Sequence, residues 1–124
     1  SFEACIEVFE PFADRVRGGF HCFVNDPAAA RRVIDLGSLV SFTGVCTFKN
    51  AGDVRESLAS VPLDKLMLET DAPFLAPVPY RGKRCEPAYV REISQVASKT
   101  RGIGLEELAE VTGATARDFF KGLE

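Results

Sequence analysis

The stretch Lys65–Pro73, KLMLETDAP, constrains the fold more than any other part of the sequence. Its short apolar run, Leu66–Leu68, suits a strand that is buried on both faces, as in a parallel sheet. Two acids, Glu69 and Asp71, follow the run, and Pro73 cannot continue a strand ladder. Because α/β folds carry their chemistry at the carboxyl ends of such strands, Asp71 is a candidate functional residue. The alternative, that Asp71 caps a turn or the next helix, remains open on these grounds.

The rest of the chain switches between the periods of strands and helices. The expected strands are residues 18–23, 39–43 and 65–69, with 45–48 as a continuation of the second. The expected helices are residues 1–15 with a conflict at Pro11, 28–36, 53–60, 88–99, and two pieces, 105–111 and 114–120, broken at Gly113. Asp26 and Pro27 read as a cap and a first helical position, whereas no cap precedes Phe2. Residues 72–84 contain three prolines and a glycine and are expected to form a loop.

Strands that alternate with helices predict an α/β fold of parallel strands with right-handed crossovers. About three strands with flanking helices are few for a complete parallel sheet. A (β/α)8 barrel of the TIM type needs about 250 residues, and this chain of 124 residues is near half of that length. No internal repeat or linker divides the chain, so residues 1–124 are predicted to form a single partial domain.

Composition places few limits on function. Apolar residues make up 46% of the chain and charged residues 27%, which is typical of a globular domain. The net charge of -3 does not indicate nucleic-acid binding, but a metal site could supply positive charge of its own. The sequence has no apolar run of membrane-spanning length and no signal-peptide pattern, so we expect a soluble, cytoplasmic protein without a membrane partner.

The four cysteines are far apart and include no C-x-x-C pair, which argues against a zinc knuckle, a redox motif and a disulfide scaffold. We expect reduced thiols in or near a core. The chain has one histidine, His21, and any histidine-dependent chemistry must use it.

His21 and Asp71 are candidate metal ligands. If their strands are parallel, both side chains can reach the same carboxyl-end rim, and imidazole and carboxylate are usual ligands of divalent metals. Two ligands are too few, because a catalytic site needs about three from the protein. His21 also has aromatic neighbours in the sequence, and the alternative interpretation is a hydrogen-bonded core histidine.

Three cations, Arg81, Lys83 and Arg84, lie close together in the expected loop that follows Asp71. Such a loop could hold a phosphate backbone by charge, with arginine offering a bidentate fork. The alternative is a solvated surface cluster.

Four groups of residues, in order along the chain, resemble the TatD family of metal-dependent deoxyribonucleases. They are His21-Cys22-Phe23, the stretch from Ser41 through Gly44 to Lys49, Leu68–Pro73, and Arg81–Arg84 followed by Glu86-Pro87. The resemblance covers nearly the whole chain. It departs from the family at Val24-Asn25, where a small hydroxylated residue and glycine are usual, and at Cys85 and Thr115, where asparagine is usual.

The resemblance implies the C-terminal half of a (β/α)8 barrel that hydrolyses DNA phosphodiester bonds with one or two divalent ions, Mg, Mn or Zn, per complete site. His21 would be a metal ligand, and Asp71 would bind metal and help to activate the attacking water. Glu69, on the same side of its strand as Asp71, would support these ligands. Arg81, Lys83 and Arg84 would bind the phosphates of the DNA.

The family's other ligands are an N-terminal His-x-His, a glutamate after a middle strand and a histidine in a His-x-Arg motif, and this sequence contains none of them. We therefore expect a truncated chain with little or no activity of its own. Half a barrel exposes strand edges, so the chain should self-associate or pair with a missing N-terminal half. Two further functions stay open: another metal-dependent barrel hydrolase, acting on acyl or amide bonds, and a non-catalytic half-barrel that acts by assembly.

Overall fold

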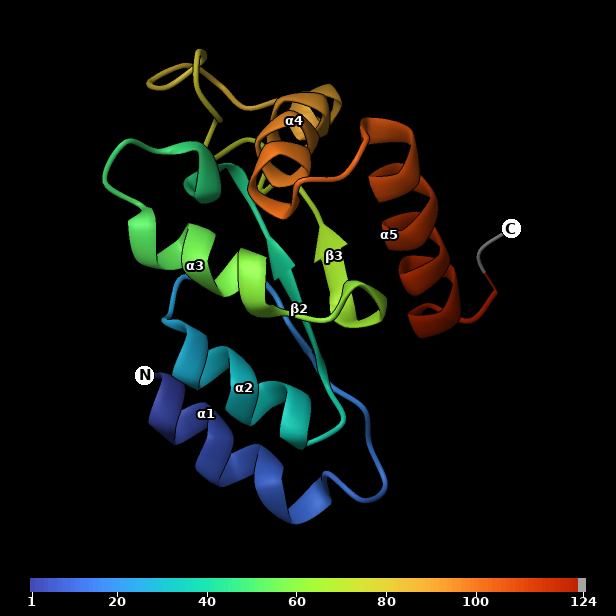
Figure 1. Cartoon of the computed structure of the whole chain (residues 1–124). Helices are drawn as coiled ribbons and strands as arrows, with labels where there is room; N and C mark the ends of the chain where they lie inside the picture. Colours follow the sequence, from blue (N-terminus) through green and yellow to red (C-terminus); the bar gives the residue numbers. More distant parts are fainter. Residues whose placement is uncertain (123–124) are drawn as a thin grey trace.

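The protein is described by a computed structural model, which covers residues 1–122 (Figure 1). Three parallel strands, in the order β1-β2-β3, form one sheet. They are β1 (Gly19–Phe20), β2 (Leu39–Phe42) and β3 (Leu66–Leu68). The helices are α1 (Phe2–Phe9), α2 (Pro27–Asp35), α3 (Gly52–Ser60), α4 (Val90–Arg101) and α5 (Leu105–Phe119). Short 3₁₀ turns lie between them: η1 (Glu10–Phe12), η2 (Gly44–Thr47), η3 (Leu63–Lys65) and η4 (Pro87–Tyr89).

The central strand β2 fixes the register of the sheet. Val40 lies opposite Phe20 on one side and Leu66 on the other. All four residues of β2 are buried, which is the pattern of a parallel strand covered on both faces. The predicted α/β class with three parallel strands is confirmed.

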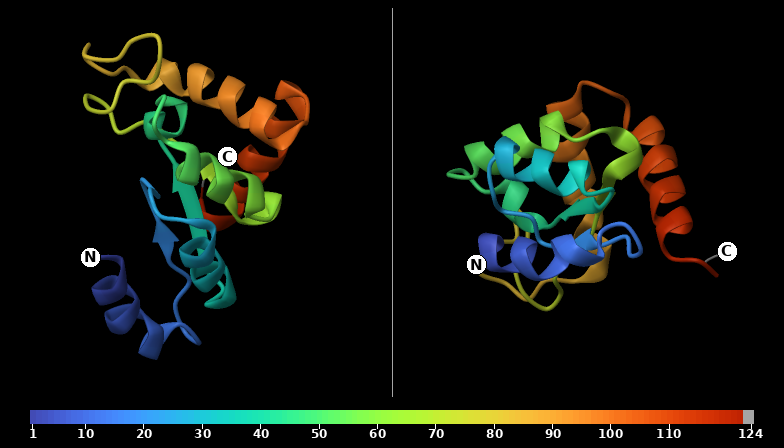
Figure 2. Two further views of the ribbon diagram at one scale, coloured as in Figure 1. Left: turned by 60° about the vertical axis from the view of Figure 1, so that its left-hand side comes forward. Right: turned by 90° about the horizontal axis from the view of Figure 1, so that it is seen from below.

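Helices α2 and α3 cover one face of the sheet, with α4 above them and α5 beside β3 (Figure 1). Side chains from these helices meet the sheet in a single apolar cluster. Val40, Phe42, Leu58, Leu66 and Ile93 are at its centre, each 0% exposed. Burying a side chain of this size contributes about 1.5–3 kcal/mol. Helix α1 stands apart from α4, alongside β1 (Figure 2).

Two sequence expectations are wrong, the continuation of the second strand and the break in the last helix. Residues 45–48 do not prolong β2, because the chain turns into η2 directly after Thr43, whose hydroxyl accepts a hydrogen bond from the Val45 N–H at 3.4 Å. Gly113 does not divide the last helix, and α5 is continuous from Leu105 to Phe119. Packing of its buried residues, Leu108 and Thr115, outweighs the low helix propensity of one glycine.

The ends of several helices confirm or correct the sequence interpretation. Asp26 caps α2, and its side chain accepts a hydrogen bond from the Ala29 N–H at 2.9 Å. The first helix does have a cap, contrary to expectation, since the Ser1 hydroxyl accepts from the Ala4 N–H at 3.3 Å. The helix is regular only to Phe9 and ends in η1, at the proline that was expected to disturb it. No helix within residues 1–122 has the length and apolar character that crossing a membrane requires.

Candidate functional site

The carboxyl ends of the three strands meet at one edge of the sheet. Beyond the strands, backbone hydrogen bonds continue the ladder: the Phe23 N–H donates to the Ser41 carbonyl at 2.9 Å, and the Glu69 N–H donates to the Phe42 carbonyl at 3.0 Å. The segments that contain the two predicted ligands therefore leave the sheet at the same edge.

Glu69 joins these segments. Its Oε1 accepts hydrogen bonds from the Cys22 N–H at 2.8 Å and from the Ser41 hydroxyl at 2.6 Å. The backbone at Cys22 turns through a φ of 47°, which L-residues seldom adopt, and the bond to Glu69 holds that turn. Ser41 was not predicted as a site residue; a polar residue in an otherwise apolar buried strand was the available signal.

His21 is directed to solvent and is not a core histidine. Its side chain is 76% exposed, and its Nδ1 lies 4.0 Å from Glu69 Oε1. Together with Ser41, Glu69 and Phe119 it lines a hollow of about 270 Å³, here called the inner hollow. This separation is longer than a hydrogen bond, so the Glu69 carboxylate lies near the ring without fixing its orientation.

Asp71 lies two residues beyond Glu69 and is half-buried. Its backbone carbonyl accepts from the Phe74 N–H at 2.7 Å, so a turn begins here, but the hydrogen bonds of residues 1–122 include none to its carboxylate. Its charge reaches Cys85, where burial first and Asp71 second raise the pKa of the thiol. The carboxylate is thus free to bind a ligand. A carboxylate that capped a turn or a helix would instead accept a backbone hydrogen bond.

The metal-ligand set is incomplete in the part of the chain that the structure describes. No group of three or more His, Cys, Asp or Glu residues there is close enough to hold an ion. The donor types at His21 and Asp71 suit a divalent metal, but about three protein ligands are needed for a catalytic site. On these residues alone the site is partial.

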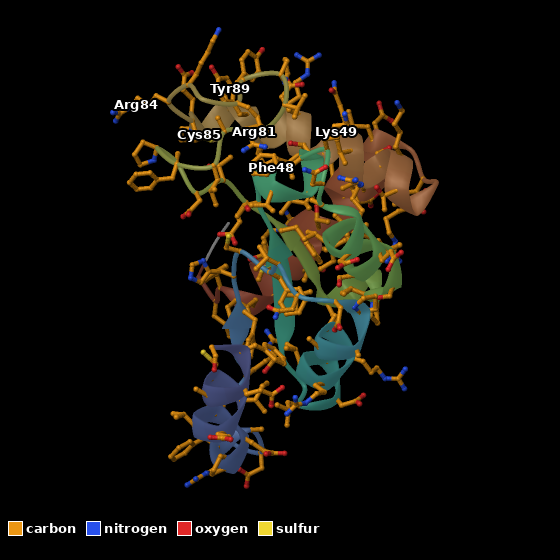
Figure 3. All side chains as sticks on the ribbon, turned by 90° about the vertical axis from the view of Figure 1, so that its left-hand side faces the viewer. Phe48, Lys49, Arg81, Arg84, Cys85 and Tyr89 are labelled. Atoms are coloured by element: carbon orange, nitrogen blue, oxygen red, sulfur yellow. The ribbon has the colours of Figure 1, made fainter. Side chains whose placement is uncertain are left out.

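The loop of residues 72–85 lies above η2 (Figure 3). The Val78 N–H donates to the Thr47 hydroxyl at 2.9 Å, and the Cys85 N–H donates to the Pro73 carbonyl at 3.0 Å. Gly44 permits this approach, because a Cβ there would lie 2.2 Å from the Leu75 carbonyl oxygen.

The three predicted phosphate-binding cations are all exposed, as expected for either interpretation of the loop. They differ in their surroundings. The Arg81 guanidinium lies 3.7 Å from the centroid of the Phe48 ring, and Arg81 and Lys83 line a second hollow of about 310 Å³, here called the loop hollow. Arg84 lies outside this hollow (Figure 3).

The four cysteines are free thiols. Cys46 and Cys85 are buried, Cys22 is half-buried with its Sγ 3.5 Å from the Thr43 hydroxyl, and Cys5 is exposed. The expectation of core thiols is therefore wrong for Cys5. Burial raises the pKa of the Cys46 thiol to about 12.

Known proteins similar to the chain are described as metal-dependent hydrolases. The uncharacterized hydrolase YcfH of Escherichia coli K12 is 47% identical over 95 residues, 77% of this chain and 36% of YcfH. The uncharacterized hydrolase YabD of Bacillus subtilis is 38% identical over 112 residues, 90% of this chain and 44% of YabD. The chain thus spans less than half the length of these relatives.

Solved structures share the fold. The TatD homologue YjjV of Escherichia coli K12 superposes with a TM-score of 0.91 at 23% identity, over 98% of this chain and 47% of YjjV. A TatD-family hydrolase of Entamoeba histolytica superposes with a TM-score of 0.85 at 16% identity. The fold is therefore that of about half a TatD-type barrel, as predicted.

The sequence profile of the family described as TatD related DNase matches residues 1–121, nearly the entire chain. Together with the metal-dependent hydrolases above, this match shows that the chain belongs to the TatD-related DNase family.

Proposed function

We propose that this chain is part of a divalent-metal-dependent hydrolase that cleaves DNA phosphodiester bonds. Membership of a family described as TatD related DNase supports the reaction class. The observation that carries the site assignment is the Glu69 carboxylate, which ties the turn at Cys22, directly after the exposed His21, to the strand end that precedes Asp71.

His21 and Asp71 would each supply one ligand, and a complementary barrel half would supply the others. A bound divalent ion supplies polarisation of the phosphoryl oxygen and a more acidic water. Asp71, whose carboxylate accepts no hydrogen bond within residues 1–122, would help to hold the ion and would orient or deprotonate the attacking water. Glu69 restrains the segment that contains His21, and Arg81, Lys83 and Arg84 attract the phosphates of the strand.

The chain by itself would have little activity. Both β1 and β3 are edge strands of the sheet, and edges of this kind pair with another chain unless they are covered. We expect self-association, or pairing with a complementary half. Sedimentation velocity of the 124-residue chain tests this, and an active monomer at micromolar concentration would contradict it.

The reaction is tested in a chimaera in which this chain replaces the matching segment of YcfH. We expect Mn²⁺-dependent cleavage of a fluorescent oligonucleotide, lost in Asp71→Asn and retained in Asp14→Asn, a change at an exposed acid of the turn after η1. Cleavage that survives Asp71→Asn would remove Asp71 from the mechanism. Hydrolysis of an ester or amide substrate in place of DNA would favour the acyl- or amide-hydrolase alternative.

Metal binding is measured on the 124-residue chain itself, so it does not depend on the chimaera folding. Isothermal titration with Mn²⁺ should show weak binding that is reduced by His21→Ala and by Asp71→Asn, but not by Asp14→Asn. Equal heats in all three variants would contradict the ligand assignment.

A further inference from the structure

Arg81 is held in place by an aromatic ring, unlike the other cations of its loop. Its guanidinium carbon lies 3.7 Å from the Phe48 centroid, well within the usual limit of about 6 Å for a cation–π contact. The ion pairs of residues 1–122 involve none of Arg81, Lys83 and Arg84. Arg81 therefore has a fixed position and an unneutralised charge.

The backbone on either side of the Phe48 ring is held by Arg55 of α3. The Arg55 Nη1 donates to the carbonyls of Cys46 at 2.9 Å and Phe48 at 2.6 Å, and its Nη2 donates to the Lys49 carbonyl at 3.3 Å. One half-buried guanidinium thus fixes the backbone on both sides of Phe48. Figure 3 shows Phe48 directly below Arg81, with Lys49 on the same side of the molecule.

Aromatic stacking and a backbone hydrogen bond also hold the loop in place. Tyr80, the residue before Arg81, stacks on Tyr89 with ring centroids 4.2 Å apart and planes 10° apart. The Lys83 N–H donates to the Tyr80 carbonyl at 3.0 Å. Arg81 is consequently held by its side chain, and its backbone lies in the turn that the bond from Lys83 to Tyr80 closes.

The loop hollow has the chemistry of a nucleotide site. It is lined by Phe48, Phe74, Arg81 and Lys83 among others, and by no acidic residue. A guanidinium that rests on a ring keeps its N–H edge free for two phosphate oxygens. Phe74 is 69% exposed and offers a face on which a base can stack. The hollow begins at Pro73, two residues after Asp71.

We propose that Phe48, Phe74, Arg81 and Lys83 form a subsite for one nucleotide, which binds its phosphate at Arg81 and its base at Phe74, and that Arg55 positions the subsite. This rests on the proposed function only in taking a DNA strand as the ligand. Arg84 contributes general attraction to the phosphates.

The probe is tetrathymidylate labelled with fluorescein, bound by the 124-residue chain in EDTA and followed by anisotropy. Arg81→Lys keeps the charge but loses the planar fork, and it should weaken binding about fivefold, since about 1 kcal/mol is at stake. Arg91→Lys, at an exposed arginine of α4 outside the loop hollow, is the matched control and should stay within about twofold of the unaltered chain. Equal effects of the two substitutions, or no binding by the unaltered chain at millimolar concentration, would overturn the proposal.

A second probe separates the base from the phosphate. An abasic tetramer of equal charge should bind about fivefold more weakly than tetrathymidylate, because base–aromatic stacking contributes about 1–3 kcal/mol. Phe74→Ala should abolish the difference between the two probes. Equal binding of both probes by the unaltered chain would remove the base from the subsite.

Arg101 provides the control for Arg55. It donates in the same manner to the carbonyls of Leu58 at 2.9 Å, Ala59 at 2.8 Å and Val61, but these lie at the end of α3, away from the loop. Arg55→Lys and Arg101→Lys should lower the melting temperature by similar amounts. Only Arg55→Lys should weaken tetrathymidylate binding, by about threefold or more.

If Arg55→Lys does not fold, Phe48→Leu still tests the contact between Phe48 and Arg81. It retains apolar bulk without the ring, and it should weaken binding as much as Arg81→Lys does. The double variant Phe48→Leu/Arg81→Lys should bind no more weakly than either single variant, because both substitutions remove the same interaction. Additive losses would show that the two residues act separately and would overturn the proposal. All these readings are taken without metal or cleavage, so a chimaera without DNase activity would leave them standing.

Discussion

The two ends of the sheet use similar side chains for opposite purposes. At the amino end, Arg17 pairs with Asp118 at 2.9 Å and lies 5.2 Å from the Phe119 centroid. The Phe119 ring in turn closes over Gly19, leaving only 3.1 Å for a Cβ there. Here an arginine, an aromatic ring and an acid neutralise and cover one another.

At the carboxyl end, the same combination is left incomplete. Arg81 rests on Phe48 without a carboxylate partner within ion-pair distance in residues 1–122. His21 is exposed, and Asp71 has no hydrogen bond to its carboxylate among the same residues. The difference supports the proposal that the carboxyl end binds a ligand while the amino end stabilises the fold, the division of labour usual in parallel barrels.

The largest effect is expected in the core next to the amino end. Leu66 begins β3 and is 0% exposed, so Leu66→Ala should lower the free energy of unfolding by about 2–5 kcal/mol. Urea denaturation measures it, with the half-buried Leu63→Ala as a milder comparison. Tetrathymidylate binding by the folded fraction should not change, and a parallel loss of affinity would break the distinction between the ends.

Gly44→Ala tests the opposite end. The added Cβ would meet the Leu75 carbonyl oxygen at 2.2 Å, so the loop must shift, at a cost of about 1–3 kcal/mol. We expect lower stability by urea denaturation together with weaker tetrathymidylate binding. Gly52→Ala, at the start of α3 where nothing lies within 4 Å, is the control and should leave both unchanged or raise stability slightly.

Local patterns predicted the elements of this fold. The run Leu66–Leu68 forms the predicted buried strand, and the cap at Asp26 opens α2 as expected. The loop of residues 72–84 follows from its prolines. In each case the cause lies within a few residues of the element, where a sequence pattern can show it.

Local patterns do not show interactions between residues that are far apart in the sequence. The turn η2 depends on Arg55 binding the carbonyls of Cys46 and Phe48, and an extended run was expected in its place. The bond from Cys22 to Glu69 joins residues 47 positions apart. The sequence predicted that His21 and Asp71 lie at one edge, but it did not show the left-handed turn at Cys22, next to which the His21 side chain is exposed.

Alkaline pH should loosen η2 at the carboxyl end. The pKa of the Cys46 thiol is raised by burial from 9.0 to about 12, so the folded chain binds a proton that the unfolded chain releases. This contribution is complete below about pH 9 and is lost as pH rises toward 12. The free energy of unfolding should fall by about 1.4 kcal/mol per pH unit from this group. Cys46→Ala should show a flatter decline than Cys5→Ala, which removes an exposed thiol, and the same slope in both variants would contradict the prediction.

The smallest effect on stability is expected at Glu69, which joins two strand ends and lies next to the proposed metal ligand His21. Its Oε1 accepts from the Cys22 N–H and the Ser41 hydroxyl, and Glu69→Gln keeps an acceptor but loses the charge. Because bonds to charged acceptors are stronger by about 1 kcal/mol, stability should fall by about that amount. Glu110→Gln on the exposed side of α5 is the control.

Mn²⁺ affinity is a second measurement on the same two variants. The lost charge of Glu69 also weakens the bond that holds the turn next to His21, so Mn²⁺ affinity should fall in Glu69→Gln but not in Glu110→Gln. If stability fell and Mn²⁺ affinity did not, Glu69 would only stabilise the fold. At this residue the carboxyl end would then have the same stabilising role as the amino end.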